Sequence, residues 1–188
     1  VPFLNKNIMK KYIQLLTIAF ISILFTGCTE SDDEFFASKI VTANNLINVS
    51  ATTNDVTVSC NFNRLLPQNT TPFDLYLTTT SEEFFFNYTL QKKNNAGIWE
   101  LVPSSGFTTT VVDGSNQYGE FISGICQLDA LQTNYEYETT IAPTSPGEYR
   151  ITLDNEIVSL GSKDAVTVTI RTTVTGVNAN NVLDFTIL

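Results

Sequence analysis

The sequence predicts an all-β domain, a two-sheet antiparallel sandwich of about nine to ten strands, over residues 38–188. Three observations support this fold class. Apolar and polar residues alternate with a period of two, threonine, valine, tyrosine and phenylalanine are abundant, and turn residues recur about every 8 to 12 positions. No convincing helical stretch interrupts the pattern. The length of the chain from Cys28 onward suits a single domain with one core.

The first strand with a clear two-residue period covers residues 56–62. Apolar residues occupy every second position from Val56 to Phe62, and polar residues fill the positions between them. This is the pattern of a strand with one buried face. The same alternation predicts further strands at residues 73–77, 84–90, 149–153 and 166–170.

The clearest local unit is the segment 84–102. Its first half runs into Asn94-Asn95-Ala96-Gly97, and a second apolar stretch returns over residues 98–102. Asparagine and glycine tolerate the positive φ angles of tight turns. The segment therefore predicts a β-hairpin.

A glycine turn followed by a tyrosine marks the segment 145–151, in which Gly147 precedes Tyr149 by two positions. The segment resembles the stretch at which immunoglobulin-like domains enter a late core strand. Residues 135–137 and 166–174 fit neighbouring strands of that fold. The resemblance extends over most of residues 38–188 as a pattern, and it implies an immunoglobulin-like or related two-sheet sandwich.

Residues 1–27 have the layout of an export signal, in which charged Lys10 and Lys11 precede an apolar run from Tyr12 to Phe25. That run is shorter than the roughly 20 residues that a membrane-spanning helix needs. Residues 24–28 resemble the lipobox of bacterial lipoproteins, which implies cleavage before Cys28 and attachment of lipid to its sulfur. Met9 opens a conventional signal, so residues 1–8 are either an over-extended start or a literally translated alternative start codon.

An acidic cluster follows the lipidated position at once. Ser31, Asp32, Asp33 and Glu34 resemble the signal with which Bacteroidota lipoproteins reach the outside of the outer membrane. The resemblance implies a lipid-anchored protein of the outer membrane that faces the cell surface. The alternative is a generic solvated tether over residues 28–37, since acidic stretches extend by self-repulsion.

Cys60 and Cys126 are the two cysteines that lipidation leaves over. An exported protein meets oxidising conditions, so a bridge between them is one hypothesis, and two free core thiols are the other. Trp99 stands too far beyond Cys60 for the immunoglobulin pattern, and Gly124 occupies the position two before Cys126. The immunoglobulin spacing of cysteine, tryptophan and tyrosine is therefore not met.

The composition argues against catalysis and against nucleic acid. From Cys28 onward, seven basic side chains face nineteen acidic ones, a net charge of −12, which is unfavourable for binding phosphates. The whole chain has no histidine, so Ser-His-Asp and Cys-His arrangements and the commonest zinc ligand are missing. We expect no enzyme, cofactor or metal; a carboxylate pair of the glycosidase type stays as a remote alternative.

One segment offers oxygen atoms that could suit calcium, namely residues 113–116 followed by Glu120. It lacks the ordered spacing of a calcium loop. A hairpin turn at Asp113-Gly114 is the alternative that we favour.

Binding is the function that suits a sandwich without catalytic groups. The alternation assigns Phe84 and its alternate neighbours to the core face and leaves Phe85 on the opposite face. With Trp99 and Tyr118 it forms the candidate aromatic contact surface; the alternative is that these rings fill a second core layer. We expect a cell-surface binding or adhesion module with a glycan or protein ligand, or an accessory subunit of an outer-membrane complex such as a nutrient importer.

Overall fold

A computed structural model describes residues 37–68, 71–162 and 166–188. The predicted signal peptide, the lipidation site Cys28 and the export residues Ser31, Asp32, Asp33 and Glu34 lie outside the described residues. Among the described residues, no helix is long and apolar enough to cross a membrane.

The all-β fold class is confirmed, with fourteen strands in one mixed sheet and two more in a small second sheet. The main sheet follows the order β1-β14-β13-β6-β10-β11-β3-β2-β15, with β12, β16, β7, β8 and β9 attached beside that path. The elements are β1 (Ser38–Thr42), β2 (Ile47–Ala51), β3 (Val56–Asn63), β4 (Leu65–Leu66), β5 (Phe73–Asp74), α2 (Leu75–Thr79), β6 (Glu83–Lys93), β7 (Trp99–Leu101), η2 (Ser104–Gly106), β8 (Phe107–Asp113), β9 (Ser115–Tyr118), β10 (Ile122–Leu128), β11 (Asn134–Pro143), β12 (Gly147–Leu153), β13 (Glu156–Leu160), β14 (Thr167–Arg171), β15 (Val174–Thr175) and β16 (Val182–Ile187).

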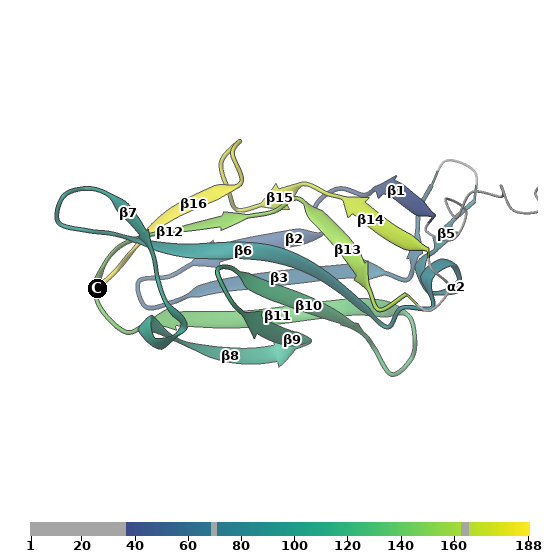
Figure 1. Ribbon diagram of the computed structural model, residues 1–188, viewed down its shortest axis with the longest axis horizontal. Coiled ribbons are helices and arrows are strands. Elements are labelled where there is room, and N and C mark those ends of the chain that lie inside the picture. The colour runs from purple at the N-terminus through teal and green to yellow at the C-terminus, as the bar shows by residue number, and fades with distance from the viewer. Residues whose placement is uncertain (1–36, 69–70, 163–165) are drawn as a thin grey trace, which may run out of the picture. The chain divides into compact units, whose positions relative to one another are not determined.

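The main sheet is doubled over on its own core. Strand β3 stands three places from β6 in the sheet order, which in a flat sheet is about 14 Å. Yet the rings of Phe62 on β3 and Phe84 on β6 have centroids 5.7 Å apart. Phe86 on β6 likewise meets Tyr137 on β11 at 5.3 Å. Figure 1 shows the same arrangement, with β6 and β13 in front of β2 and β3.

The first two and the last two strands of the sheet order are linked by short stretches of chain, from β1 to β2 and from β14 to β15. Strands β1 and β2 are consecutive, but β1 pairs with β14 at one end and β2 with β15 near the other. Both of these pairs are parallel, so the prediction of purely antiparallel pairing is wrong. Hydrogen bonds also run continuously around the path, and two separate sheets of the immunoglobulin type are not confirmed.

The strand count was predicted too low: the described residues form sixteen strands, three of which, β4, β5 and β15, are only two residues long. One predicted strand is largely a helix. Residues 73–77 alternate in polarity, but Asp74 accepts a hydrogen bond from the backbone N–H of Leu77 and caps α2. An aspartate at this position favours a helix start over an extended strand. Alternation in polarity alone does not reveal that a helix cap competes with the extended conformation here.

The segment at Asp113-Gly114 is a crossing and not the predicted hairpin turn. Strand β8 pairs with β11, whereas β9, which follows after Gly114 alone, pairs with β10. Gly114 has φ of +72°, and a Cβ there would lie 2.2 Å from the backbone oxygen of Ile125. Only glycine fits this bend, because any side chain would collide with backbone.

Several local predictions are confirmed. Strand β3 buries Val56, Val58, Cys60 and Phe62, and β6 buries Phe84, Phe86 and Tyr88. The hairpin of β6 and β7 pairs Lys93 with Trp99, and Gly97 in its turn has φ of +79°. At the start of β12, the Tyr149 hydroxyl donates to the backbone oxygen of Ser145, four residues upstream, over 2.7 Å.

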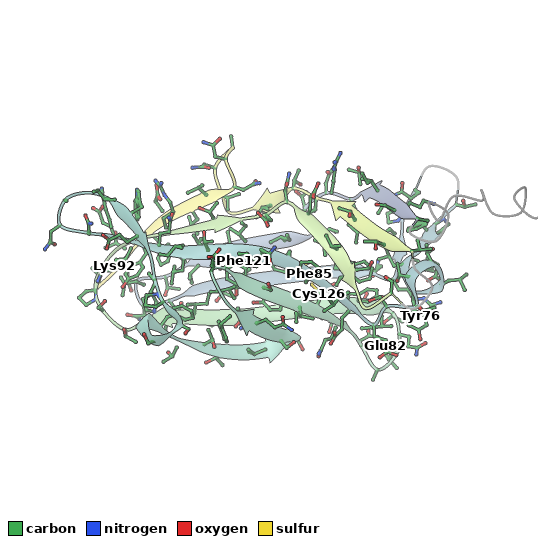
Figure 2. The ribbon with its side chains drawn as sticks, in the orientation of Figure 1. Tyr76, Glu82, Phe85, Lys92, Phe121 and Cys126 are labelled. Carbon is green, nitrogen blue, oxygen red and sulfur yellow. The ribbon has the colours of Figure 1, made fainter. Side chains whose placement is uncertain are left out.

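The sheet has two distinct ends. Helix α2 and β5 lie at the end where the chain enters β1, since the Lys39 ammonium sits 4.2 Å from the centre of the Phe73 ring. Strand β7 and the C-terminus lie at the opposite end (Figure 1). Figure 2 shows Tyr76, a residue of α2, and Glu82 at one end and Lys92 at the other. We call these the entry end and the far end.

Candidate binding face

Four strands at the far end, β7, β6, β12 and β16, present one continuous outward face. Strand pairing places Leu101, Gln91, Arg150 and Asp184 in one row across them. The next row contains Trp99 and Lys93. Residues paired directly across strands share a face. Leu90, which precedes Gln91, and Tyr149 and Ile151, which flank Arg150, are buried on the opposite, core side. We call this outward surface the Trp99 face.

Arg150 is the centre of the Trp99 face. Its Nε and Nη2 donate to the two carboxylate oxygens of Asp184 over 2.7 and 3.2 Å. Its guanidinium carbon lies 4.2 Å from the centre of the Trp99 ring, within the range of a cation–π contact. The hydrogen bonds from Arg150 hold the pKa of Asp184 below its usual range. The arginine is therefore fixed as a charged group against the indole.

A second ion pair and an ordered turn border this cluster. The Lys93 ammonium lies 2.8 Å from a carboxylate oxygen of Glu148 and 5.6 Å from the Trp99 ring centre. In the turn, the side-chain oxygen of Asn94 accepts from the backbone N–H groups of Ala96 and Ile98, both over 2.9 Å. These contacts hold the strand that carries Trp99 in place.

Apolar side chains extend the Trp99 face toward β10. Leu101 is 53% exposed and Phe121, in the turn between β9 and β10, is 46% exposed. Both line a small cavity of about 20 Å³. The face thus offers an indole, a fixed guanidinium and apolar contacts, the kinds of group that make protein or sugar contacts without chemistry.

The structure does not bring the three predicted aromatic residues together. Phe85 and Trp99 share the outward side of β6 and β7, but eight residues of β6 separate Phe85 from the partner of Trp99, about 27 Å. Tyr118 pairs with Ile122, whose partner Tyr88 is a core residue, so Tyr118 lies on the core side at a sheet edge. Its hydroxyl bonds Thr109 over 2.6 Å. Ligand contact by any of the three stays a prediction.

Cys60 and Cys126 are both free and buried. They project from β3 and β10 into the shared core, close enough for the Cys126 thiol to interact with Cys60. Burial first, and then the neighbouring thiol, raise the pKa of Cys60 well above its ordinary value. The Cys60 thiol is therefore a poor nucleophile in the folded state. Their joining under oxidation stays a prediction.

The glycosidase alternative needs two carboxylates facing each other in a cleft. Glu82 and Glu83 line one cavity of about 420 Å³ near the entry end, beside Gln127. Glu82 lies in the bend before β6, and Glu83 is the first residue of that strand. Glu83 accepts a hydrogen bond from Gln127. In the described part of the chain, no three acidic or cysteine side chains gather to hold a metal.

Comparisons with known proteins give weak structural similarity alone. No family model matches the chain, and no curated protein matches it. Among solved structures, the fold is similar to the seventh ScaB type I cohesin from Pseudobacteroides cellulosolvens, at 16% identity and a TM-score of 0.30, covering 81% of this chain and 92% of that one. A similarity this low carries no argument about function.

Sequence reasoning missed the partners of Trp99. Arg150 and Asp184 lie far beyond it in the chain, and no local motif links them. The alternation did place Arg150 on the face opposite Tyr149 and Ile151. The pairing of β12 with β6 and of β16 with β12 could not be predicted from the sequence.

Proposed function

We propose that this chain is a non-catalytic binding or adhesion module of the bacterial envelope, anchored by lipid on Cys28 and displayed on the cell surface. The resemblance of residues 24–28 to a lipobox and the acidic residues after Cys28 support the anchor and its destination. The complete lack of histidine in the chain supports a non-catalytic role. The immunoglobulin-like classification of the doubled sheet belongs to the same proposal.

One observation of the structure carries the binding role. The Trp99 face lies at the far end, away from the point where the chain enters from its proposed anchor. An aromatic ring stacked on a salt-bridged arginine beside an exposed leucine has the composition of a contact surface. A tethered domain would hold this face outward, toward a glycan or protein of the surroundings.

A second candidate function is an accessory subunit of an outer-membrane complex, such as a nutrient importer. The exposed side chains of Leu101 and Phe121 favour it, because apolar surface at one site supports a lasting protein interface. This role predicts that the protein co-purifies with a barrel protein when the envelope is gently dissolved.

Protease shaving of intact cells tests display. The full-length protein carries a C-terminal tag, and a matched variant has Asp32, Asp33 and Glu34 changed to alanine. We expect the tag to be lost from the wild type and protected in the variant. Protection in both would place the domain inside the envelope and contradict surface adhesion.

Binding is tested on panels of purified extracellular polysaccharides and proteins. Trp99→Ala and Arg150→Ala should each lose most of the binding. The control Ser50→Ala, an exposed residue on strand β2 outside the Trp99 face, should bind like the wild type. Equal binding by all of these variants would place the ligand site elsewhere.

A further inference from the structure

Three leucines protrude into solvent at the entry end. Leu65 on β4 is 51% exposed, Leu77 on α2 is 76% exposed, and Leu131 in the turn between β10 and β11 is 82% exposed. We call them the leucine tips. Exposed single leucines are ordinary on protein surfaces. What sets these apart is that three separate segments bring them to the same end of the sheet.

Hydrogen bonds hold the three segments together. The backbone N–H of Arg64 donates to the oxygen of Thr133 over 2.8 Å, and Leu75 donates to the oxygen of Arg64 over 3.0 Å. Residues from all three segments line one cavity of about 380 Å³. The segments that carry the leucine tips are therefore joined to one another by hydrogen bonds and are not independent loops.

The same end receives the chain from its proposed lipid anchor. Lys39, the second residue of β1, packs on Phe73, which directly precedes Asp74 and α2. The segment from Cys28 to Ala37, even when fully extended, spans at most about 35 Å. A bilayer that holds Cys28 is thus always within reach of the leucine tips.

We infer that the leucine tips insert into the surface of the bilayer that carries the lipid anchor, and so hold the domain with its far end pointing away. This inference rests on the proposed anchoring at Cys28. Apolar side chains gain free energy when they leave water, and a short tether raises their local concentration at the membrane.

The chemistry around the tips fits a neutral phospholipid surface. Arg64 is paired with Asp74, and Glu82, Glu83 and Asp129 lie at the same end without a matching cluster of basic side chains in the described part of the chain. Binding to anionic lipid needs such clusters. The contact therefore depends on apolar insertion, and zwitterionic lipids suffice for it.

Single-tryptophan fluorescence on vesicles tests the insertion. Trp99 is the only tryptophan of the chain, so a Trp99→Phe background removes the native signal. Full-length lipidated protein with Leu77→Trp or Leu131→Trp is reconstituted into phosphatidylcholine vesicles that contain brominated lipid. Ile98→Trp is the matched control, since Ile98 is 60% exposed in the hairpin turn at the far end.

We expect the emission of Leu77→Trp and Leu131→Trp to shift to the blue and to be quenched by brominated lipid, and the emission of Ile98→Trp to stay unchanged. Unchanged emission in all three, from protein that floats with the vesicles, would overturn the insertion and leave the anchor intact. Quenching of Ile98→Trp as well would overturn the upright orientation. Protein that fails to float would overturn the anchor, and the insertion with it.

Discussion

Each end of the sheet carries an arginine held by an aspartate beside an aromatic ring. At the entry end, Nε and Nη2 of Arg64 donate to the two carboxylate oxygens of Asp74 over 2.8 and 2.7 Å, with the Tyr76 ring centre 5.1 Å from the guanidinium carbon. At the far end, Arg150, Asp184 and Trp99 repeat this arrangement, with a ring distance of 4.2 Å.

The neighbours of the two clusters differ more than the clusters themselves. Asp74 also caps α2, and the backbone of Arg64 bonds to Thr133 and Leu75. Arg150 and Asp184 sit on strands that the sheet already pairs. The entry-end cluster therefore builds the local fold, whereas the far-end cluster adds little to it and is available for binding. The same combination of side chains therefore has a structural role at the entry end and a proposed binding role at the far end.

The largest effect that separates the two ends should come from the aspartates. Asp74→Ala removes the cap of α2 and leaves Arg64 without its partner, and we expect a loss of about 1–2 kcal/mol in the free energy of unfolding. Asp184→Ala removes an exposed partner, and its change should be too small to resolve. Urea denaturation of both variants measures the difference.

Asp74→Asn separates the two roles of Asp74. Asparagine caps helices about as well as aspartate but cannot form the ion pair. We expect this variant to keep most of the stability that Asp74→Ala loses. Equal losses for the substitutions at positions 74 and 184 would contradict the distinction between the two ends.

Acid should weaken the entry end first. The hydrogen bonds from Arg64, and then the backbone N–H of Leu77, hold the pKa of Asp74 below its usual range. A carboxylate whose pKa is lowered by folding adds stability above its unfolded pKa of about 3.9, and that stability is lost as pH falls through the folded value. Asp74→Asn should therefore flatten the loss of stability below about pH 4.

Asp184 is the control for this titration. Its pKa is also lowered by Arg150, but its side chain is 53% exposed, so solvent screens the interaction. Urea midpoints measured over a series of pH values should show less flattening for Asp184→Asn. If Asp74→Asn and Asp184→Asn gave the same pH profile, burial would not explain any difference in how strongly the two ion pairs stabilise the fold.

The fold class and the faces of its main strands could be predicted from the sequence. Where a strand has one buried side, its apolar residues alternate, and β3, β6 and β12 follow this rule closely. The β6–β7 hairpin was readable from the asparagine and glycine residues of its turn. These are local signals, and each acts within about a dozen residues.

Pairing between distant strands could not be predicted. Nothing in the sequence near Val41 indicates its parallel partner Ile170, and nothing near Arg150 indicates Trp99. The helix start at Asp74 was missed because a capping residue and a strand alternation coincided there. The Trp99 face is assembled by pairing between distant strands. For this reason Trp99 is the one residue that the predicted aromatic surface shares with it.

A smaller effect concerns the contact between Trp99 and Arg150. As the only tryptophan, Trp99 reports on its surroundings by fluorescence. Arg150→Ala should uncover the ring and raise its quenching by acrylamide, and Arg150→Lys should give an intermediate value because lysine stacks less well. Arg64→Ala at the other end should leave the quenching unchanged. A response to Arg64→Ala would show that the two ends are coupled.

The smallest effect should follow removal of the exposed leucines. Leu131→Ser at the entry end and Leu101→Ser at the far end should each change the free energy of unfolding by less than about 0.5 kcal/mol, because neither side chain is in the core. Such a result would mean that the fold does not need either leucine, as the proposed contacts outside the domain require. A loss of more than about 1 kcal/mol in urea would instead assign that leucine to the fold. Near-zero losses at both ends are what the two proposed contacts require, with lipid at Leu131 and a ligand at Leu101, because a contact residue of this kind is not part of the core.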